Sequence, residues 1–170
     1  MKTYETERLL LKPTDLEDAE FILQLLNSES FIKYIGDRNV RTIEDAENYI
    51  RNRCFPQFER LGYGSFTVIL KEDSSKMGTC GVYARENTDN APDIGFAFLP
   101  QFEGKGYGYE SANFIKNLVK NGYGIKKLGG ITVEYNHASR KLLEKLGLKF
   151  QKKFFMDGDP EELLYFEANL

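Results

Sequence analysis

The sequence predicts a single α+β domain, and three observations carry that prediction. Three runs with strand character follow one another in mid-chain, separated only by short polar turns, which favours an antiparallel meander. Segments with helical periodicity come before and after that meander. The chain has 170 residues, which suits one domain with its own core, and no repeat or linker divides it. We therefore expect residues 1–170 to fold as one unit.

The chain opens with an expected strand and an expected helix. Residues 6–12 read as the strand, which Pro13 ends. Thr14-Asp-Leu-Glu17 matches the S/T-x-x-E capping box that begins many helices, and an apolar helical stripe follows it. The stripe consists of Leu16, Ala19, Ile22, Leu23 and Leu26.

A second helix is expected from Thr42 to Arg60. Pro56 should kink it or end it early, because proline lacks the N–H that a helix interior needs. Gly62 and Gly64 mark the latest end. Its apolar face consists of Ile43, Ala46, Ile50 and Cys54.

The remaining elements alternate between strand and helix. The meander occupies residues 65–70, 78–84 and 93–99, with turns at 72–75 and 87–92. Helices are expected at residues 109–121 and 138–146, and further strands at 128–133, 150–155 and 163–166.

Composition and charge narrow the functional class. An apolar content of 41% with 14% aromatic residues is typical of a globular protein. The formal charge of −3 argues against sequence-independent nucleic-acid binding, which needs a basic face. Cys54 and Cys80 lie on different expected elements, so we expect no disulfide and no metal site. No segment is long enough to span a membrane, and charged residues interrupt the opening segment where a signal peptide would be apolar. We expect a soluble, cytoplasmic protein with no membrane partner.

The stretch from Asp93 to Glu110, DIGFAFLPQFEGKGYGYE, is the most informative in the chain. A strand runs through Pro100 into Gly104, Gly106 and Gly108, directly before a helix. Closely spaced glycines let backbone N–H groups point toward one position, and the helix N-terminus adds its positive dipole. The pattern predicts a site for the phosphate or pyrophosphate of a nucleotide-like ligand.

Two other kinds of glycine-rich site are less compatible with the sequence. A P-loop needs a lysine followed by Ser or Thr after its second glycine, and neither is present here. A dinucleotide-binding fold would use Glu134, at the end of the next strand, to bind a ribose. However, the spacing is G-x-G-x-G rather than G-x-G-x-x-G, and the loop follows an antiparallel meander. A dinucleotide-binding oxidoreductase stays open as the weaker alternative.

Several segments together resemble the GCN5-related N-acetyltransferase (GNAT) superfamily, particularly the branch of ribosomal-protein N-terminal acetyltransferases. The resemblance covers nearly the whole chain, and the segments occur in the family's order. They are Thr6-Glu-Arg-Leu-Leu-Leu-Lys-Pro13 with Asp18-Ala19, Asp93-Ile-Gly-Phe96, Leu99-Pro-Gln-Phe-Glu-Gly-Lys-Gly-Tyr-Gly108, Asn136-His-Ala-Ser139 and Glu144-Lys-Leu-Gly-Leu148.

The resemblance implies a fold and an activity. The fold would be the three-layer acyl-CoA N-acyltransferase fold, a mixed and mostly antiparallel sheet with helices on both faces and a splayed parallel strand pair. The activity would be direct acetyl transfer from acetyl-CoA to an amine, either a protein N-terminus or a small molecule. The first two helices and the 156–162 turn would form the acceptor site, and a homodimer stays open.

The resemblance also assigns residues to the cofactor. Backbone N–H groups of the glycine loop would hold the pyrophosphate, and Phe96 and Phe98 would offer backbone groups to the pantetheine arm. The Phe98 N–H could also stabilise the thioester oxygen. Asn136 would contact the arm or, equally, act as a helix N-cap. The loop residues are Glu103, which departs from the family's glutamine or arginine, and Gly104, Lys105, Gly106, Tyr107 and Gly108.

Catalysis would need a base for the amine and a proton donor for the departing thiolate. Asp93 is the candidate base, directly or through water, while Glu134 is better explained as a solvated carboxylate. Many family members place a tyrosine seven residues after the asparagine, but this chain has Leu143 there. Ser139 is the candidate donor, with first-turn capping as its alternative role, and Tyr135 is a weaker candidate. The missing tyrosine keeps open a catalytically silent acyl-CoA-binding module. His137 is expected to be a surface residue.

Overall fold

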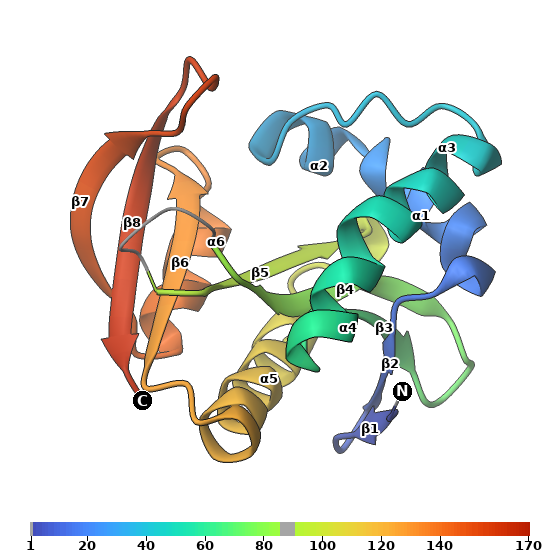
Figure 1. The fold of residues 1–170 in the computed structure, drawn as a ribbon, viewed down its shortest axis with the longest axis horizontal. Coiled ribbons are helices and arrows are strands. Elements are labelled where there is room, and N and C mark those ends of the chain that lie inside the picture. The colour runs from blue at the N-terminus through green and yellow to red at the C-terminus, as the bar shows by residue number, and fades with distance from the viewer. Residues whose placement is uncertain (1, 86–90) are drawn as a thin grey trace.

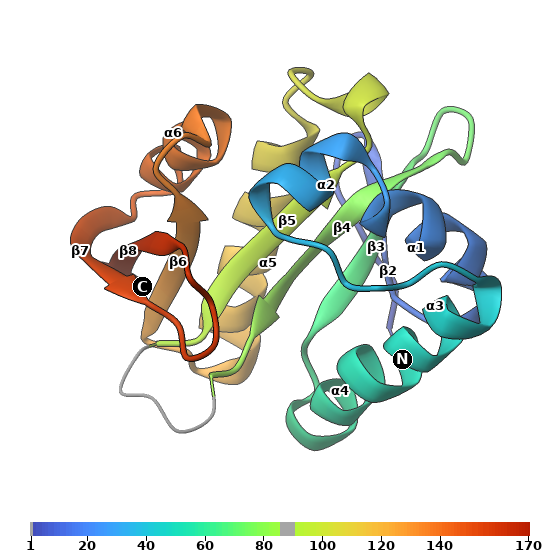
Figure 2. The same cartoon turned by 90° about the horizontal axis from the view of Figure 1, so that it is seen from above.

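The computed structural model describes residues 2–85 and 91–170, and within them it contains one mixed sheet with helices on both faces (Figures 1 and 2). The sheet has eight strands in the order β1-β2-β3-β4-β5-β6-β8-β7. All neighbouring strands are antiparallel except β5 and β6, which are parallel. The strands are β1 Tyr4–Glu5, β2 Leu9–Pro13, β3 Ser65–Leu70, β4 Lys76–Tyr83, β5 Asp93–Phe98, β6 Lys127–Val133, β7 Lys149–Phe155 and β8 Glu162–Asn169. The predicted antiparallel meander and mixed sheet are confirmed.

Two helical layers cover the sheet. One consists of α1 Ala19–Leu26, α2 Glu29–Tyr34, α3 Ile43–Tyr49 and α4 Phe55–Leu61, and the other of α5 Tyr107–Tyr123 and α6 His137–Lys145. Figure 2 shows the first layer in front of the strands and α5 behind them. One buried apolar cluster contains residues of α1, α2 and α3, and the other contains residues of α5 and α6 together with Phe58 of α4. The three-layer prediction is confirmed. None of the described helices combines the length and apolar character that a membrane crossing requires.

The parallel strands β5 and β6 meet only at their beginnings. Their single register pair is Asp93 with Gly129, and the Gly129 N–H donates to the Pro92 carbonyl at 2.9 Å. A Cβ at Gly129 would lie 2.9 Å from the Tyr165 ring and 3.3 Å from the Ala91 carbonyl oxygen, so glycine fits this crowded position. Beyond this point β5 stays paired with β4 and β6 with β8, and the two strands diverge. The splayed pair expected from the resemblance is therefore present.

The predicted first strand, residues 6–12, is interrupted. The Thr6 N–H donates to the Leu9 carbonyl at 2.9 Å, and this turn separates the short β1 from β2. The side chains of Thr6 and Arg8 both bind Glu110 of α5. This tertiary contact bends a segment that looks extended in the sequence.

The predicted capping box is displaced by one residue. Asp15 is the N-cap, and its partner is Asp18 rather than Glu17, in a 3₁₀ turn that leads into α1. Thr14 is fully buried, and its hydroxyl donates to Ser65 Oγ at 3.2 Å instead of capping the helix.

The helix expected at residues 42–60 consists of three parts. A π-helical turn, Ile50–Cys54, joins α3 to α4 directly before Pro56, where a backbone donor is missing. Gly62 ends α4 with a left-handed φ of 75°, as predicted. Ile43 was expected on the apolar face but is 52% exposed, because it lies at the very start of α3. The short helix α2, which Ser28 caps, was not predicted.

Asp18 ties the first helical layer to the sheet. Its carboxylate is fully buried, 2.6 Å from Lys76 Nζ and 3.2 Å from Lys12 Nζ, and it accepts a hydrogen bond from Thr67 at 2.8 Å. Burial by itself would raise the pKa of Asp18, but the hydrogen bonds from Lys76, Asp15 and Thr67 outweigh it and lower the pKa. Asp18 therefore stays ionised and holds β2, β3 and β4 against the start of α1.

We predict that Asp18→Asn lowers the free energy of unfolding by about 3 kcal/mol at neutral pH, because two lysines lose their buried counter-charge. The contribution of a carboxylate with a lowered pKa is complete above its ordinary value of 3.8 and is lost as the pH falls through the folded value. Urea denaturation at several pH values should show the difference from the unmodified protein narrowing below about pH 4. Glu5→Gln, which removes an exposed ion pair with Lys71, should cost less than about 0.5 kcal/mol. A difference that did not change with pH would contradict this role.

Candidate functional site

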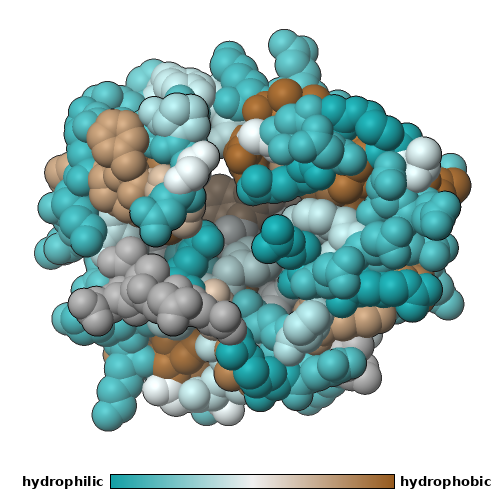
Figure 3. Space-filling view, turned by 45° about the horizontal axis from the view of Figure 1, so that its top comes forward, coloured by the Kyte–Doolittle hydropathy of each residue, from teal (hydrophilic) through white to brown (hydrophobic). Residues whose placement is uncertain are grey.

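A cavity of about 440 Å³ lies where β5 and β6 diverge. Its walls come from α2, the end of β5, residues 102–109, and residues 135–142 at the start of α6. Figure 3 shows the hollow near the centre of that face, with hydrophobic surface at depth and hydrophilic side chains around it. The diverging strands thus create an opening into the middle of the sheet.

The glycine loop forms one end of the cavity. A 3₁₀ turn, Pro100–Phe102, follows β5, and the chain then reverses through Gly104 and Gly106. These two glycines have φ angles of 71° and 83°, which side-chain-bearing residues rarely adopt. Gly106 is the N-cap of α5 and lines the cavity. The left-handed turns explain two of the three glycines in the motif.

The N-terminus of α5 has unpaired backbone donors. The first bond of the helical ladder runs from the Glu110 N–H to the Gly106 carbonyl at 3.0 Å. The N–H groups of Tyr107, Gly108 and Tyr109 therefore have no acceptor within the helix, and no side chain of residues 2–85 or 91–170 caps this end. All three residues line the cavity, and α5 adds the dipole of a 17-residue helix. This geometry suits an anion such as a phosphate or pyrophosphate.

Gly108 serves close packing. A side chain at this position would lie 3.3 Å from Leu142 Cδ2 and 3.6 Å from Phe98 Cε2. Glycine therefore lets the first turn of α5 lie directly against α6 and β5. The third glycine of the motif keeps the helix end next to the divergence of the strands.

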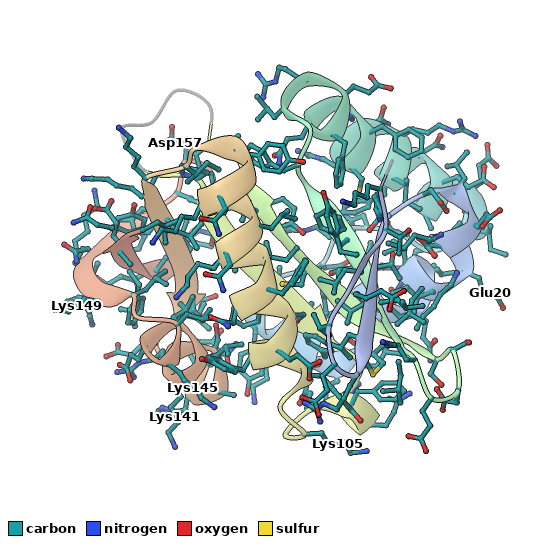
Figure 4. The ribbon with its side chains drawn as sticks, turned by 90° about the horizontal axis from the view of Figure 1, so that it is seen from below. Glu20, Lys105, Lys141, Lys145, Lys149 and Asp157 are labelled. Atoms are coloured by element: carbon teal, nitrogen blue, oxygen red, sulfur yellow. The ribbon has the colours of Figure 1, made fainter. Side chains whose placement is uncertain are left out.

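Most of the residues predicted to bind a cofactor line this cavity. They are Phe96, Phe98, Glu103, Gly104, Gly106, Tyr107, Gly108 and Asn136. Phe96 and Phe98 lie on the part of β5 that β6 does not pair with. Glu103 lines the cavity, but it is exposed to solvent, and this exposure weakens the repulsion between its carboxylate and an anion in the cavity. Lys105 is not among the lining residues. Figure 4 shows its side chain at the molecular surface, and its Nζ lies 6.0 Å from the Phe102 ring centroid.

Asn136 and Ser139 lie together at the start of α6. The Asn136 Oδ1 accepts a hydrogen bond from the Ser139 N–H at 3.1 Å, so Asn136 is the N-cap that the sequence left as one alternative. Within the described chain, neither the Asn136 amide nitrogen nor the Ser139 hydroxyl hydrogen-bonds to another residue. Both residues line the cavity, so both groups are available there. Capping and ligand binding are therefore compatible at Asn136.

Asp93 is not part of the cavity wall. It begins β5 as predicted, but it is 4% exposed and its carboxylate accepts hydrogen bonds from the Arg85 guanidinium. Asp93 pairs with Tyr83 and Phe96 with Cys80, so the side chains of Asp93 and Phe96 point to opposite faces of the sheet. Burial raises the pKa of Asp93, and the ion pair with Arg85 offsets only part of this shift.

The second wall of the cavity was missed by the sequence reasoning. Ser30, Phe31 and Tyr34 of α2 line it together with Ile35, the residue after α2, whereas the longer helices expected to form an acceptor site do not. The available signal was Ser28, whose side chain caps α2 by accepting from the Phe31 N–H. Six residues are too few for a recognisable helical period, so this signal was weak.

Tyr135 lies at the cavity, whereas Leu143, at the position where many family members have a tyrosine, does not. Tyr135 lines the cavity, its hydroxyl donates to the Lys33 carbonyl at 3.2 Å, and its ring centroid lies 5.9 Å from that of Tyr34. Hydrogen bonding to Glu161 raises the pKa of Tyr135. Leu143 is 1% exposed and packs against Gly130, so it is a core residue. His137, predicted to be at the surface, is exposed and lies at the cavity rim.

Comparisons with known proteins agree with this architecture. The family model of the acetyltransferase (GNAT) domain matches residues 8–149. A Bacillus subtilis protein, the uncharacterized N-acetyltransferase YoaA, is 26% identical over 149 residues, which cover 88% of this chain and 82% of YoaA. An acetyltransferase structure from Agrobacterium tumefaciens superimposes with a TM-score of 0.83 at 19% identity and covers 100% of this chain and 95% of its own. The structure of RimL, a ribosomal alpha-N-protein acetyltransferase in complex with coenzyme A, superimposes with a TM-score of 0.82 at 15% identity. The match covers 99% of this chain and 98% of RimL.

Proposed function

This chain belongs to the acetyltransferase (GNAT) domain family and is an N-acetyltransferase, and we propose that it transfers the acetyl group of acetyl-CoA directly to a primary amine. The acceptor would be a protein N-terminus or a small-molecule amine. The observation that carries the proposal is the uncapped N-terminus of α5, which opens into a cavity between diverging strands. That arrangement offers backbone donors to a diphosphate and a strand edge to a polyamide arm.

The described residues fit two parts of acetyl-CoA, the diphosphate and the pantetheine arm. Free N–H groups of Tyr107, Gly108 and Tyr109, together with the turn at Gly104–Gly106, suit the diphosphate. The edge of β5 beyond Asp93 has no partner on β6, so its backbone can pair with the pantetheine amides as an added strand would. The solved structure of RimL contains coenzyme A, and this chain shares its fold. These features support acetyl-CoA as the cosubstrate.

Chemistry would take place where β5 and α6 face each other. The amine nitrogen attacks the thioester carbonyl carbon, the C–S bond breaks, and the thiolate accepts a proton. We assign the Phe98 N–H to the carbonyl oxygen, where developing negative charge needs a donor. We assign the Ser139 hydroxyl to the departing sulfur, since it lines the cavity without an acceptor among the described residues. A serine hydroxyl is a poor acid, so it would donate a hydrogen bond while water supplies the proton.

Removing the proton of the amine is the remaining task. An α-amino group has a pKa of about 8 and a lysine about 10.4, so an α-amino acceptor is easier to activate. Asp93 has a raised pKa, which favours proton acceptance, but it is buried against Arg85 outside the cavity wall. It would therefore have to act through water. On the acceptor side, the aromatic rings of Tyr34 and Tyr135 provide a surface that suits an amine.

Ligand binding and turnover test the proposal. Coenzyme A should raise the melting temperature, since a ligand at a hundred times its dissociation constant stabilises by about 2.7 kcal/mol. NAD at the same concentration should not. Acetyl-CoA should then be consumed in the presence of at least one member of a panel of peptides with free N-termini, polyamines, aminoglycosides and amino acids. Stabilisation by NAD alone would favour the oxidoreductase, and stabilisation by coenzyme A with no turnover would favour a silent binding module.

Ser139 and Asn136 should affect different kinetic constants. Ser139→Ala removes a donor used when the thiolate forms, so kcat should fall about tenfold while KM for acetyl-CoA changes little. Asn136→Asp keeps an oxygen that can cap the Ser139 N–H but removes the amide donor, so KM should rise about tenfold at unchanged stability. Steady-state kinetics and urea denaturation of both variants check this. An Asn136→Asp variant with normal KM would leave Asn136 as a cap only.

If Asp93 is the base, its raised pKa sets the acid side of the pH profile. The value of kcat/KM should fall as the pH drops through that pKa, at a higher pH than an ordinary aspartate would give. Asp93→Asn should lower kcat/KM about a hundredfold and remove the part of the pH dependence that Asp93 causes. The separate fall in kcat/KM that protonation of the amine substrate causes should remain. A folded Asp93→Asn variant with an unchanged profile would show that Asp93 only pairs with Arg85.

A further inference from the structure

The segment Thr6–Arg8, between β1 and β2, contacts the first turn of α5. Glu110 Oε1 accepts hydrogen bonds from Thr6 Oγ1 at 2.6 Å and from the Arg8 N–H at 2.9 Å, and Arg8 Nε donates to Oε2 at 2.7 Å. More than a hundred residues separate the two partners in sequence. In Figure 4 the ribbon of β1 and β2 runs beside the end of α5 that leads to Lys105. The carboxylate of Glu110 is thus fully engaged on the side away from the cavity.

Arg8 also touches the glycine loop on both sides of Gly106. Its Nη1 donates to the Lys105 carbonyl at 3.1 Å, and its guanidinium lies 4.5 Å from the Tyr107 ring centroid. A side chain at Gly106 would lie 3.4 Å from Arg8 Nη2, so the guanidinium packs directly behind this turn. Arg8 is not among the residues that line the cavity. One side chain therefore supports the turn from behind without entering the ligand site.

The negative charge of Glu110 gives its contact with Arg8 an electrostatic role in addition to the structural one. Glu110 lies one turn from the free N–H groups of α5, where an unpaired carboxylate would repel a bound anion. Burial by itself would raise the pKa of Glu110, but hydrogen bonds from Thr6 and Arg8 outweigh it and lower the pKa. Glu110 is therefore charged at neutral pH, and the guanidinium at 2.7 Å neutralises it.

We propose that Arg8 is a positioning residue for diphosphate binding. It fixes the backbone of Lys105 and Tyr107 on either side of Gly106 and neutralises Glu110, so that the amides at the start of α5 face the ligand. The inference rests on the proposed function, since it concerns the same site. It adds a residue outside the glycine motif, contributed by the N-terminal segment. The Arg8 side chain is 41% exposed, and an ion pair this exposed contributes little to overall stability.

Titration calorimetry with coenzyme A and dephospho-coenzyme A tests the role of Arg8. Arg8→Ala should weaken both ligands about tenfold, because both contain the diphosphate that the loop holds. Adding Glu110→Gln to Arg8→Ala should restore affinity about threefold, since it removes the charge left unpaired. Glu5→Gln is the matched control. It removes an ion pair of the same N-terminal segment, to Lys71, that does not touch the loop, and affinity should stay within about twofold.

Turnover separates positioning from a general loss of structure. With acetyl-CoA, Arg8→Ala should raise KM about tenfold and leave kcat within about twofold, because the loop is remote from the thioester. With S-acetylpantetheine, which lacks the diphosphate, Arg8→Ala and the unmodified protein should have the same KM. Should Arg8→Ala fold poorly, Arg8→Lys keeps the charge but loses the forked contact, and it should lose about threefold in affinity.

The outcomes distinguish this inference from the function on which it rests. Equal binding of coenzyme A by Arg8→Ala and the unmodified protein would overturn the inference and leave the function intact. A loss seen with coenzyme A but not with dephospho-coenzyme A would also overturn it, since Arg8 would then contact the 3′-phosphate. An unmodified protein that binds neither ligand would remove the proposed function, and this inference with it.

Discussion

The structure depends on one constraint at the centre of the sheet, which is that β5 and β6 pair only at Asp93 and Gly129, near the beginning of each strand. Gly129 allows the two strands to meet at Asp93, and beyond that point each strand follows its own antiparallel neighbour. Antiparallel pairing with β4 on one side and β8 on the other satisfies both strands' outer edges. Beyond that pair their inner edges do not pair with each other, and the cavity lies between the end of β5 and the residues 135–142 that follow β6. A regular parallel sheet here would have no room for a ligand.

The N-terminal end of α5 forms a further part of the wall of the cavity that opens where β5 and β6 diverge. Two left-handed glycines bring the chain from β5 into the helix without a capping side chain, so the first N–H groups remain free. Gly108 then lets the helix pack closely on β5 and α6. On the far side of the loop, Arg8 and Glu110 form an ion pair that fixes the turn and removes a charge. The cavity-lining residues at the start of α5 and the contacts of Arg8 therefore lie on opposite sides of the same short loop.

Polar contacts, in addition to apolar packing, attach the first helical layer to the sheet. Asp18 is buried between Lys12, Lys76 and Thr67, and this links the start of α1 to three strands. A buried charge costs desolvation free energy, which is recovered only with several good partners. Such an arrangement fixes geometry as well as stability. It holds in place the layer from which α2 contributes the second wall of the cavity.

The sequence by itself determined the elements with long or regular patterns, because hydrophobic period and turn residues are local properties. The meander, the helices after it and the glycine-rich loop all lie where the pattern predicted, within a few residues. The sequence also predicted part of the cavity wall, since Gly104, Gly106, Phe96 and Asn136 belong to segments that resemble a known family.

The tertiary structure decided what depends on contacts between distant residues. The sequence pattern favoured Thr14 as part of a helix cap, but the Thr14 hydroxyl donates a hydrogen bond to Ser65. The pattern also favoured one strand at residues 6–12, but contacts of Thr6 and Arg8 with Glu110 interrupt it. Likewise, Asp93 begins the expected strand, but only the fold shows that it pairs with Arg85 and is not among the residues that line the cavity. A sequence pattern states which residues are neighbours along the chain. The partner of a charged or hydroxyl side chain is chosen in space, where burial makes an unpaired polar group costly.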